Sequence, residues 1–443
     1  MITQRIHTQA DTPQSRLMTV HEVQPDEKNY RLPARIIRPL LGTVVHEFLD
    51  GTQLIVLRPD EQAHWDRFIA SAPNGHLLQS WAWGELKRAF GWTPLRVALW
   101  DAAAEEILAG AQVLLRPLPA LGLAMAYIPK GPVLDWDDTT SAEVFFAGLH
   151  AYLRSQRVAF LRLEPDLPKK VYPSALENGE TPPEPCFPAA EEAPLGGLYS
   201  AAQGQAVARQ LRNIGFQPVL DHIQQLRTIM VDLTPDAEAI TLRQHKTRRY
   251  NANLAARKGV TVRQARSLSD LERWYALFET TRLRDGFESR TFAYFRQVWD
   301  LLRPNGQAQL FLAEHDGKLL AGALVTLVGQ QGIYLYAASS NEGRKLMPND
   351  LLQREMMRWA KSQGATLYDL WGIAETDDPA DPLAGVTHFK RGWGGQVVEY
   401  LGAFDYIYAP VAYRVFRAGR TLAKQVVAAR VRLVRKHAER AGD

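Results

Sequence analysis

The pattern of apolar and polar residues predicts one order of helices and strands that occurs twice along the chain. In each half, two amphipathic helices are followed by three apolar runs, a further helix and a strand. Turn-forming residues separate the three runs, which is typical of an antiparallel meander. The runs of the first half are 95–100, 107–115 and 123–128, and those of the second half are 309–315, 319–328 and 332–338.

Short sequence matches in the same order support a duplication. Residues 108–111 and 320–323 both read LAGA, Ser155-Gln156 corresponds to Ser362-Gln363, and 211–219 parallels 389–397. We interpret the chain as two copies of one α/β unit of about 180–200 residues each. The predicted fold class is therefore α/β (α+β): two tandem units with mixed, mostly antiparallel sheets flanked by helices.

The expected boundaries follow from this duplication and from changes in composition. They are an N-terminal extension at 1–39, a first unit at 40–235 containing a proline-rich insertion at 168–197, a second unit at 236–402 that begins with a basic helix, and a basic amphipathic helix at 412–443. We expect residues 403–443 to pack back on the first unit.

The stretch from 349 to 405 organises the second unit. Leu352, Met356, Met357 and Ala360 form one apolar stripe, which predicts a helix that begins at a capping Asn349 and ends at Gly364. A short apolar strand at 366–370, an acidic loop and a helical turn with the sequence HFKRGWGG follow.

Composition indicates a globular protein with two cores, because 443 residues exceed the size of one ordinary domain. The single cysteine, Cys186, excludes an internal disulfide framework, and no cysteine or histidine spacing indicates a metal site. The polar N-terminus lacks the apolar core of a signal peptide, and no apolar run is long enough to span a membrane. We therefore expect a cytoplasmic protein.

Positive charge is concentrated in two places. Residues 239–269 contain eight lysines and arginines and no acid, which favours an anionic partner over a solvated helix face. The helix from 412 onward carries arginine and lysine around an apolar stripe. Such a helix can contact an anionic membrane surface, RNA phosphates or its own domain.

The order of elements resembles the GNAT acyltransferase fold. In that family a glycine-rich turn binds the pyrophosphate of coenzyme A through backbone N–H groups. The corresponding turns here, 127–136 and 337–350, do not have two or three glycines at the spacing of such a loop. The resemblance therefore predicts the fold without coenzyme A, and we expect no cofactor.

Several motifs resemble the FemABX family more specifically, over residues 50–408. They are LLQSWAWGELKRAFGW (77–92), YIPKGPVLD (127–135), KTRRYNANLAARKGV (246–260), KLMPNDLLQREMMRWAKSQGATLYDLWGI (345–373) and THFKRGWGGQVVEYLGAFD (387–405). The resemblance implies an aminoacyltransferase for the interpeptide bridge of peptidoglycan. Its donor would be an aminoacyl-tRNA, and its acceptor the side-chain amine of residue 3 in lipid II or UDP-MurNAc-pentapeptide.

The resemblance also implies roles for individual residues. Phe389 and Lys390 would lie beside the aminoacyl ester, where a lysine can stabilise negative charge on the ester oxygens. Asp135 is a candidate base for the acceptor amine, although its position favours the alternative interpretation of an aspartate that caps a turn.

The residues implied in substrate binding lie in both units. Lys87 would contact the acceptor diphosphate together with Arg248 or Arg249, and Tyr127 and Lys130 would line the acceptor groove. Tyr334 and Tyr336 alternate with apolar residues, so we expect both on one face of a strand, in the core or on a groove wall.

Two other functions remain open from the sequence. An acyl-CoA-dependent N-acyltransferase would use the same fold, and a non-catalytic adaptor would use the basic segments to bind RNA or a membrane. The sequence does not determine the transferred amino acid, lysine or ornithine at the acceptor position, the position in the bridge, the general base or the oligomeric state.

Overall fold

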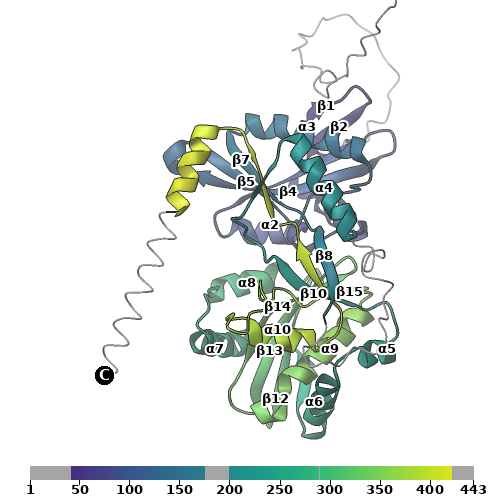
Figure 1. Ribbon diagram of the computed structural model, residues 1–443, viewed down its shortest axis with the longest axis vertical. Coiled ribbons are helices and arrows are strands. Elements are labelled where there is room, and N and C mark those ends of the chain that lie inside the picture. Colours follow the sequence, from purple (N-terminus) through teal and green to yellow (C-terminus); the bar gives the residue numbers. More distant parts are fainter. Residues whose placement is uncertain (1–40, 175–198, 289, 422–443) are drawn as a thin grey trace, which may run out of the picture.

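The computed structural model describes residues 41–174, 199–288 and 290–421, which form two sheet-based units stacked along the long axis of the molecule (Figure 1). The first sheet has the strand order β1-β2-β3-β4-β5-β7-β17-β9, with β6 beside β4. The second has the order β11-β12-β13-β14-β15-β10-β16-β8. Each sheet contains one parallel pair of neighbouring strands, β5 with β7 in the first and β14 with β15 in the second, and all other pairs are antiparallel. The predicted mixed, mostly antiparallel fold class is confirmed.

The first sheet and its helices come mainly from the N-terminal half. Its strands are β1 (Thr43–Glu47), β2 (Thr52–Val56), β3 (Thr93–Asp101), β4 (Glu106–Leu118), β5 (Leu123–Pro129), β6 (Val133–Leu134), β7 (Val158–Glu164), β9 (Gln217–Val219) and β17 (Ala403–Ile407). Its helices are α1 (Gln62–Ser71), α2 (Trp81–Arg88), α3 (Thr139–Ser155) and α4 (Ala201–Ile214).

The second sheet comes mainly from the C-terminal half. Its strands are β8 (Pro168–Pro173), β10 (Arg227–Asp232), β11 (Thr261–Gln264), β12 (Ala308–His315), β13 (Lys318–Val328), β14 (Gln331–Ser339), β15 (Leu367–Asp369) and β16 (Gln396–Tyr400). Its helices are α5 (Ala237–Leu242), α6 (Lys246–Arg257), α7 (Leu268–Asp285), α8 (Phe292–Leu301), α9 (Pro348–Ser362) and α10 (Ala384–Arg391).

Both sheets contain the same arrangement of five elements. An antiparallel meander (β3-β4-β5 or β12-β13-β14) leads through one helix (α3 or α9) to a strand that pairs in parallel with the last strand of the meander. A parallel pair needs such a crossover, whereas the antiparallel pairs close through short turns. The arrangement is the one that the repeated apolar pattern predicts.

The chain crosses between the two units, which changes the predicted boundaries. β10 lies within the range assigned to the first unit but pairs with β15 and β16 of the second sheet. The boundary at 402 needs no such change, since β17 lies in the first sheet, between β7 and β9, and the sequence analysis expects residues 403–443 to pack on the first unit. The strand pattern alone does not specify the partner of a strand, because the apolar runs of both sheets are alike.

The proline-rich insertion begins later than predicted. Residues 168–173 form β8, in which Val171 and Tyr172 pair with Val398 and Val397 of β16. β8 is the edge strand of its sheet, where prolines are tolerated because one row of N–H groups needs no ladder partner. The remainder of the predicted insertion and the N-terminal extension at 1–39 lie outside the described residues.

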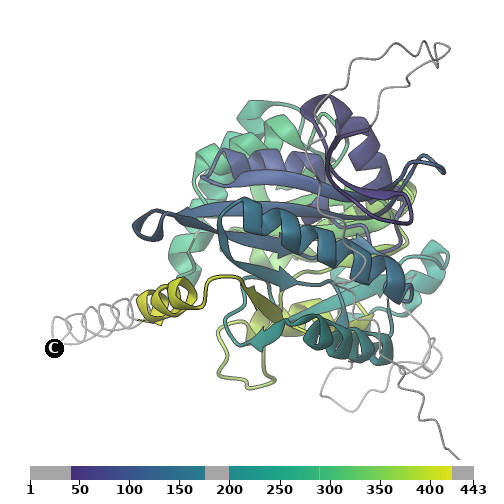
Figure 2. The same cartoon turned by 90° about the horizontal axis from the view of Figure 1, so that it is seen from above.

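Helices cover both faces of the first sheet. α3 and α4 bury one face, where Phe146, Leu149 and Leu211 are enclosed. The helix at 410–421 covers part of another apolar cluster, where Tyr413 packs edge to face on Phe160, and it lies at the periphery of the molecule (Figure 2). The rest of the predicted basic helix at 412–443 lies outside the described residues. No helix in the described ranges has the length and hydropathy needed to cross a bilayer.

Helix α9 follows the predicted stripe but not the predicted start. Leu352, Met356, Met357 and Ala360 are all buried. The helix begins at Pro348 after Met347, which has a left-handed backbone, so Asn349 is not the N-cap. Proline favours the first helical position because its missing N–H would have no helical partner there.

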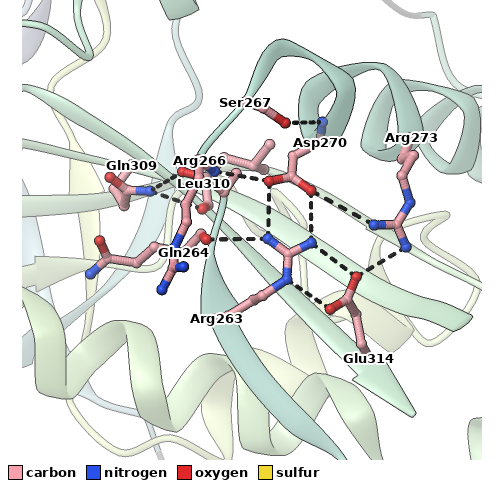
Figure 3. A network of polar contacts seen from close by, with 10 residues as sticks. Arg263, Gln264, Arg266, Ser267, Asp270, Arg273, Gln309, Leu310 and Glu314 are labelled. Atoms are coloured by element: carbon pink, nitrogen blue, oxygen red, sulfur yellow. Dashed lines mark hydrogen bonds and ion pairs between the residues drawn. The ribbon is translucent and has the colours of Figure 1, made fainter. Parts of the chain in front are cut away.

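An ion network ties β11 to α7 and β12 at the outer edge of the second sheet (Figure 3). The Arg263 guanidinium donates to both carboxylate oxygens of Asp270, at 2.7 and 3.0 Å, and to both of Glu314, at 2.8 and 3.1 Å. Arg273 joins Glu314 at 3.0 Å. Arg263 on β11 therefore links α7 and β12, because its guanidinium binds one carboxylate from each of them with two hydrogen bonds.

Replacing Arg263 by alanine should lower the free energy of unfolding by about 1–2 kcal/mol, because the lost hydrogen bonds are charge-assisted but partly exposed to water. Urea denaturation measures this change. Arg266→Ala is the matched control, since the Arg266 side chain is exposed and has no partner within the described part of the chain. Equal stability of the two variants would contradict the assigned contribution of the network.

Candidate active site

Lys390 lies where two parallel strands of the second sheet diverge. β14 and β15 pair only from Gln331 to Ile333, and β15 ends at Asp369. Beyond that end, the chain forms a turn whose carbonyl groups face α10. The Lys390 amino group donates to the carbonyl oxygens of Trp371 at 3.2 Å and Gly372 at 2.7 Å. The lysine is thus fixed beneath a turn that is itself half-buried.

The environment of Lys390 is mostly apolar. Its side chain is 6% exposed, and the Tyr334 ring centre lies 5.8 Å from the amino nitrogen. Burial lowers the pKa of Lys390 to about 8, while the nearby carboxylate of Asp369 opposes this shift. At neutral pH the group remains a cation, and its charge is poorly screened by water.

Phe389 on α10, Trp393 just after that helix and Arg248 on α6 form a second group of side chains. The Phe389 and Trp393 rings meet edge to face at 6.0 Å, and the Arg248 guanidinium lies 5.2 Å from the Phe389 ring centre. Arg248 also donates to Asp350 at 2.8 Å. Arg248 is thus already paired with a carboxylate, whereas the half-buried Arg249 has no side-chain partner among the described residues. Arg249 is the better placed of the two predicted phosphate ligands.

The basic segment at 239–269 is less free than its composition indicates. Arg243 pairs with Asp232, Arg248 with Asp350, and Arg263 with Asp270 and Glu314. These acids come from outside the segment, so its lack of internal acids does not leave all of its charges unpaired. Within the described ranges, Arg249, Arg257 and Arg266 keep side chains without a partner.

Lys87 lies at the contact between the two units. Its amino nitrogen is 4.4 Å from the centre of the Trp83 ring on its own helix and 5.5 Å from the Tyr294 ring of α8. Burial and, to a smaller extent, the charge of Arg290 together lower the pKa of Lys87 to about 8. The Tyr294 and Tyr336 hydroxyl groups are 3.3 Å apart. The fold therefore brings Lys87 and Tyr336, which are far apart in sequence, into one cluster.

Tyr334 and Tyr336 do not share a face of β14, and the prediction that they do is wrong. Val325 of β13 pairs with Tyr334 and the adjacent Leu324 pairs with Tyr336, which leaves Leu335 as an extra residue in a β-bulge. Tyr334 therefore packs on the core beneath α9, and Tyr336 on the core between the two units.

Tyr127 and Lys130 are buried instead of lining an open groove. The Tyr127 hydroxyl donates to Glu164 at 2.6 Å and accepts from Gln224 at 2.8 Å. The Lys130 amino group pairs with Asp166 at 2.9 Å over the ring of Tyr400. The two side chains are 3% and 2% exposed, so both polar groups are taken up by protein contacts.

Asp135 lies away from Lys390. It is exposed before α3, and its carboxylate accepts a hydrogen bond from the backbone N–H of Asp137 at 3.0 Å. No contact joins it to Phe389 or Lys390 in the described part of the chain. This geometry is that of an aspartate that caps a turn, which was the alternative interpretation of its sequence position.

The structure adds residues that the sequence analysis missed, at the junction of the two units. The His76 ring stacks on the Trp371 ring at 6.3 Å, and burial lowers the pKa of His76 to about 4. Asp369, which is fully buried, lies at the end of the apolar run 366–370. The sequence offers one signal for Asp369, since an acidic residue at the end of an apolar run is unusual. No sequence pattern distinguishes His76 from an ordinary histidine. No cluster of three or more metal-binding side chains occurs among the described residues.

Comparisons with known proteins agree with this fold. The lipid II:glycine glycyltransferase of Staphylococcus saprophyticus is 26% identical over 439 residues, covering 85% of this chain and 98% of that protein. The enzyme of the same name from Staphylococcus haemolyticus is 26% identical over 416 residues, covering 79% and 92%. The crystal structure of FemX superposes with a TM-score of 0.69 at 24% identity, covering 81% of this chain and 99% of that one.

These relatives confirm the predicted enzyme class, an aminoacyltransferase, and the structure of FemX confirms the fold. The profile of the FemAB family matches residues 61–318 and 301–420, which together are most of the chain. The protein belongs to the FemAB family.

Proposed function

We propose that this protein transfers an aminoacyl group from a charged tRNA to the side-chain amine of residue 3 in the stem peptide of lipid II. The observation that carries the proposal is the buried Lys390, which two carbonyl groups hold at the divergence of β14 and β15. The relatives named lipid II:glycine glycyltransferase support lipid II as acceptor and glycine as the first amino acid to test.

The reaction proceeds by direct attack of the acceptor amine on the aminoacyl ester. Negative charge develops on the ester oxygen, and the Lys390 ammonium stabilises it because a buried cation acts strongly where water is excluded. The bond to the ribose oxygen then breaks, and the proton lost by the amine balances the one that the leaving hydroxyl gains. The protein holds the two substrates in position and needs no covalent intermediate.

The start of α9 argues against coenzyme A as the donor. In the GNAT fold an anion would bind the N–H groups at this helix start. Here Asp350 lies in the first turn of α9, buried and paired with Arg248. A buried ion pair thus already occupies this helix start, so the position is unsuited to a pyrophosphate.

Lys87 is proposed to contact the acceptor diphosphate. Lys87→Met should raise KM for the acceptor by about tenfold and change kcat little. A phosphate contact distant from the ester stabilises the bound substrate and the transition state equally. Steady-state kinetics with varied lipid II measures this split. Arg88→Met, at the exposed end of the same helix, is the control and should keep both constants. A fall in kcat alone for Lys87→Met would contradict the assignment.

The site of action follows from the acceptor. Lipid II is a membrane lipid, so we propose a cytoplasmic protein that contacts the inner membrane surface peripherally. The helix beginning at 410 supports this, since Arg414, Arg417 and Arg420 lie on its described part.

Ligand protection tests the proposed function against its two alternatives. Glycyl-tRNA and lipid II should each raise the temperature of unfolding, and coenzyme A should not. Protection by coenzyme A would favour an acyl-CoA-dependent enzyme. Protection by tRNA without any transfer to lipid II would favour a non-catalytic adaptor.

A further inference from the structure

Asp369 organises the turn that holds Lys390. It ends β15 and is fully buried between Ile333 of β14 and Met230 of β10. One carboxylate oxygen accepts the backbone N–H of Trp371 at 2.7 Å and the hydroxyl of Thr228. A buried carboxylate is costly unless its contacts compensate, so its place here calls for a role.

The contact to Trp371 closes an Asx turn over residues 369–372. Trp371 has a φ of 62°, in the left-handed region that bulky residues rarely adopt. The turn directs the carbonyl groups of Trp371 and Gly372 at the Lys390 amino group. Asp369 therefore fixes the two acceptors of Lys390 through the backbone that it holds.

Asp369 also acts on Lys390 by charge. The other groups around this pair are Tyr334 on β14, Tyr400 on β16, and Lys130 and Asp166 from the first unit. Among these, the negative charge of Asp369 is the one that favours the ammonium form of Lys390. Burial raises the pKa of Asp369 itself to about 6, so the carboxylate is ionised in the neutral range.

We propose that Asp369 is a positioning residue of the transfer reaction: through the 369–372 turn it fixes the two carbonyl groups that hold the Lys390 ammonium, and its carboxylate is a buried counter-charge to that group. The inference rests on the proposed function. Asp369 does not contact substrate in this proposal. The left-handed backbone of Trp371 places its carbonyl oxygen where the Lys390 amino group can donate to it.

Two substitutions of Asp369 distinguish the effect of the turn on kcat from the effect of the negative charge. Asp369→Asn keeps an oxygen acceptor for the Trp371 N–H but removes the charge, so the ammonium of Lys390 is less favoured. The pH at which kcat falls on the alkaline side should move lower, with about a tenfold loss of kcat at pH 8. Asp369→Ala also loses the turn and should lower kcat by about 100-fold. KM for both substrates should change little.

A double variant distinguishes positioning from a general loss of structure. In the Lys390→Met background, Asp369→Asn should cause no further loss of kcat, because its effect passes through Lys390. An equal further loss in that background would overturn the proposal.

A direct titration keeps the inference separate from the proposed function. The ¹³Cε signal of Lys390, assigned by its absence in Lys390→Ala, should titrate near pH 8 in the wild type and at lower pH in Asp369→Asn. An unchanged midpoint would overturn the inference even if the enzyme is active. An inactive wild type with the expected titration would instead refute the proposed function alone.

Discussion

Replacing Lys390 by methionine is expected to lower kcat for aminoacyl transfer by about 100- to 1000-fold. Methionine keeps the length and apolar stem of the side chain but removes the ammonium group that the fold holds at the divergence of β14 and β15. The loss should fall on kcat, because the charge on the ester oxygen develops mainly in the transition state. Single-turnover rates with glycyl-tRNA and lipid II measure it directly.

His388→Met is the matched control for this prediction. His388 lies on the same helix two residues away, and its side chain is exposed. The control should keep the wild-type rate, and both variants should unfold at similar temperatures. If Lys390→Met transfers at the wild-type rate, Lys390 has no part in the chemistry.

Replacing Asp405 by alanine is expected to lower the free energy of unfolding by about 3 kcal/mol, because the buried Arg162 guanidinium loses its two shortest hydrogen bonds and keeps only the partly exposed Asp221 as a carboxylate partner. Asp405 on β17 accepts two hydrogen bonds from Arg162 on β7, each of 2.8 Å, and one from the Tyr413 hydroxyl at 2.7 Å. Arg162 and Asp405 are 1% and 0% exposed. Urea denaturation of the full chain measures the change.

The pair joins the last strand of the chain to the first sheet. The double variant Arg162→Met/Asp405→Leu should recover much of the lost stability, since no buried charge is left unpaired. Glu143→Ala, at an exposed position of α3, is a surface control and should stay within about 0.5 kcal/mol of the wild type. A loss below 1 kcal/mol for Asp405→Ala would contradict this assignment and would mean that Asp221, which already accepts from Arg162 at 3.1 Å, is sufficient to hold the guanidinium.

The sequence predicts the fold well where the signal is local. The two meanders, the crossover helices and the stripe of α9 follow from periodicity within short windows. The place of β10 in the second sheet does not, because its pairing with β15 spans more than a hundred residues. The bulge at Leu335 is a similar case: one extra residue in the strand places Tyr334 and Tyr336 on different cores, and no sequence pattern marks it.

The candidate site shows the same division. Lys390 and Lys87 are found through motifs, and the structure gives each a defined environment. The sequence does not show that the charge of Arg248 is paired, since its partner Asp350 is 102 residues away. The link from Asp369 through Trp371 to Lys390 depends on the left-handed backbone of Trp371, in the loop between the end of β15 and α10. A sequence shows the residues of such a link but not the direction of their carbonyl groups.

The mass of lipid II after incubation with this protein tests the central claim most directly. Purified protein, lipid II and a mixture of charged tRNAs would be combined, and the lipid product analysed by mass spectrometry. The account predicts a product heavier by one amino-acid residue, formed by the wild type and nearly abolished in Lys390→Met. An unchanged lipid II mass with every charged tRNA, in the presence of folded protein, would contradict it.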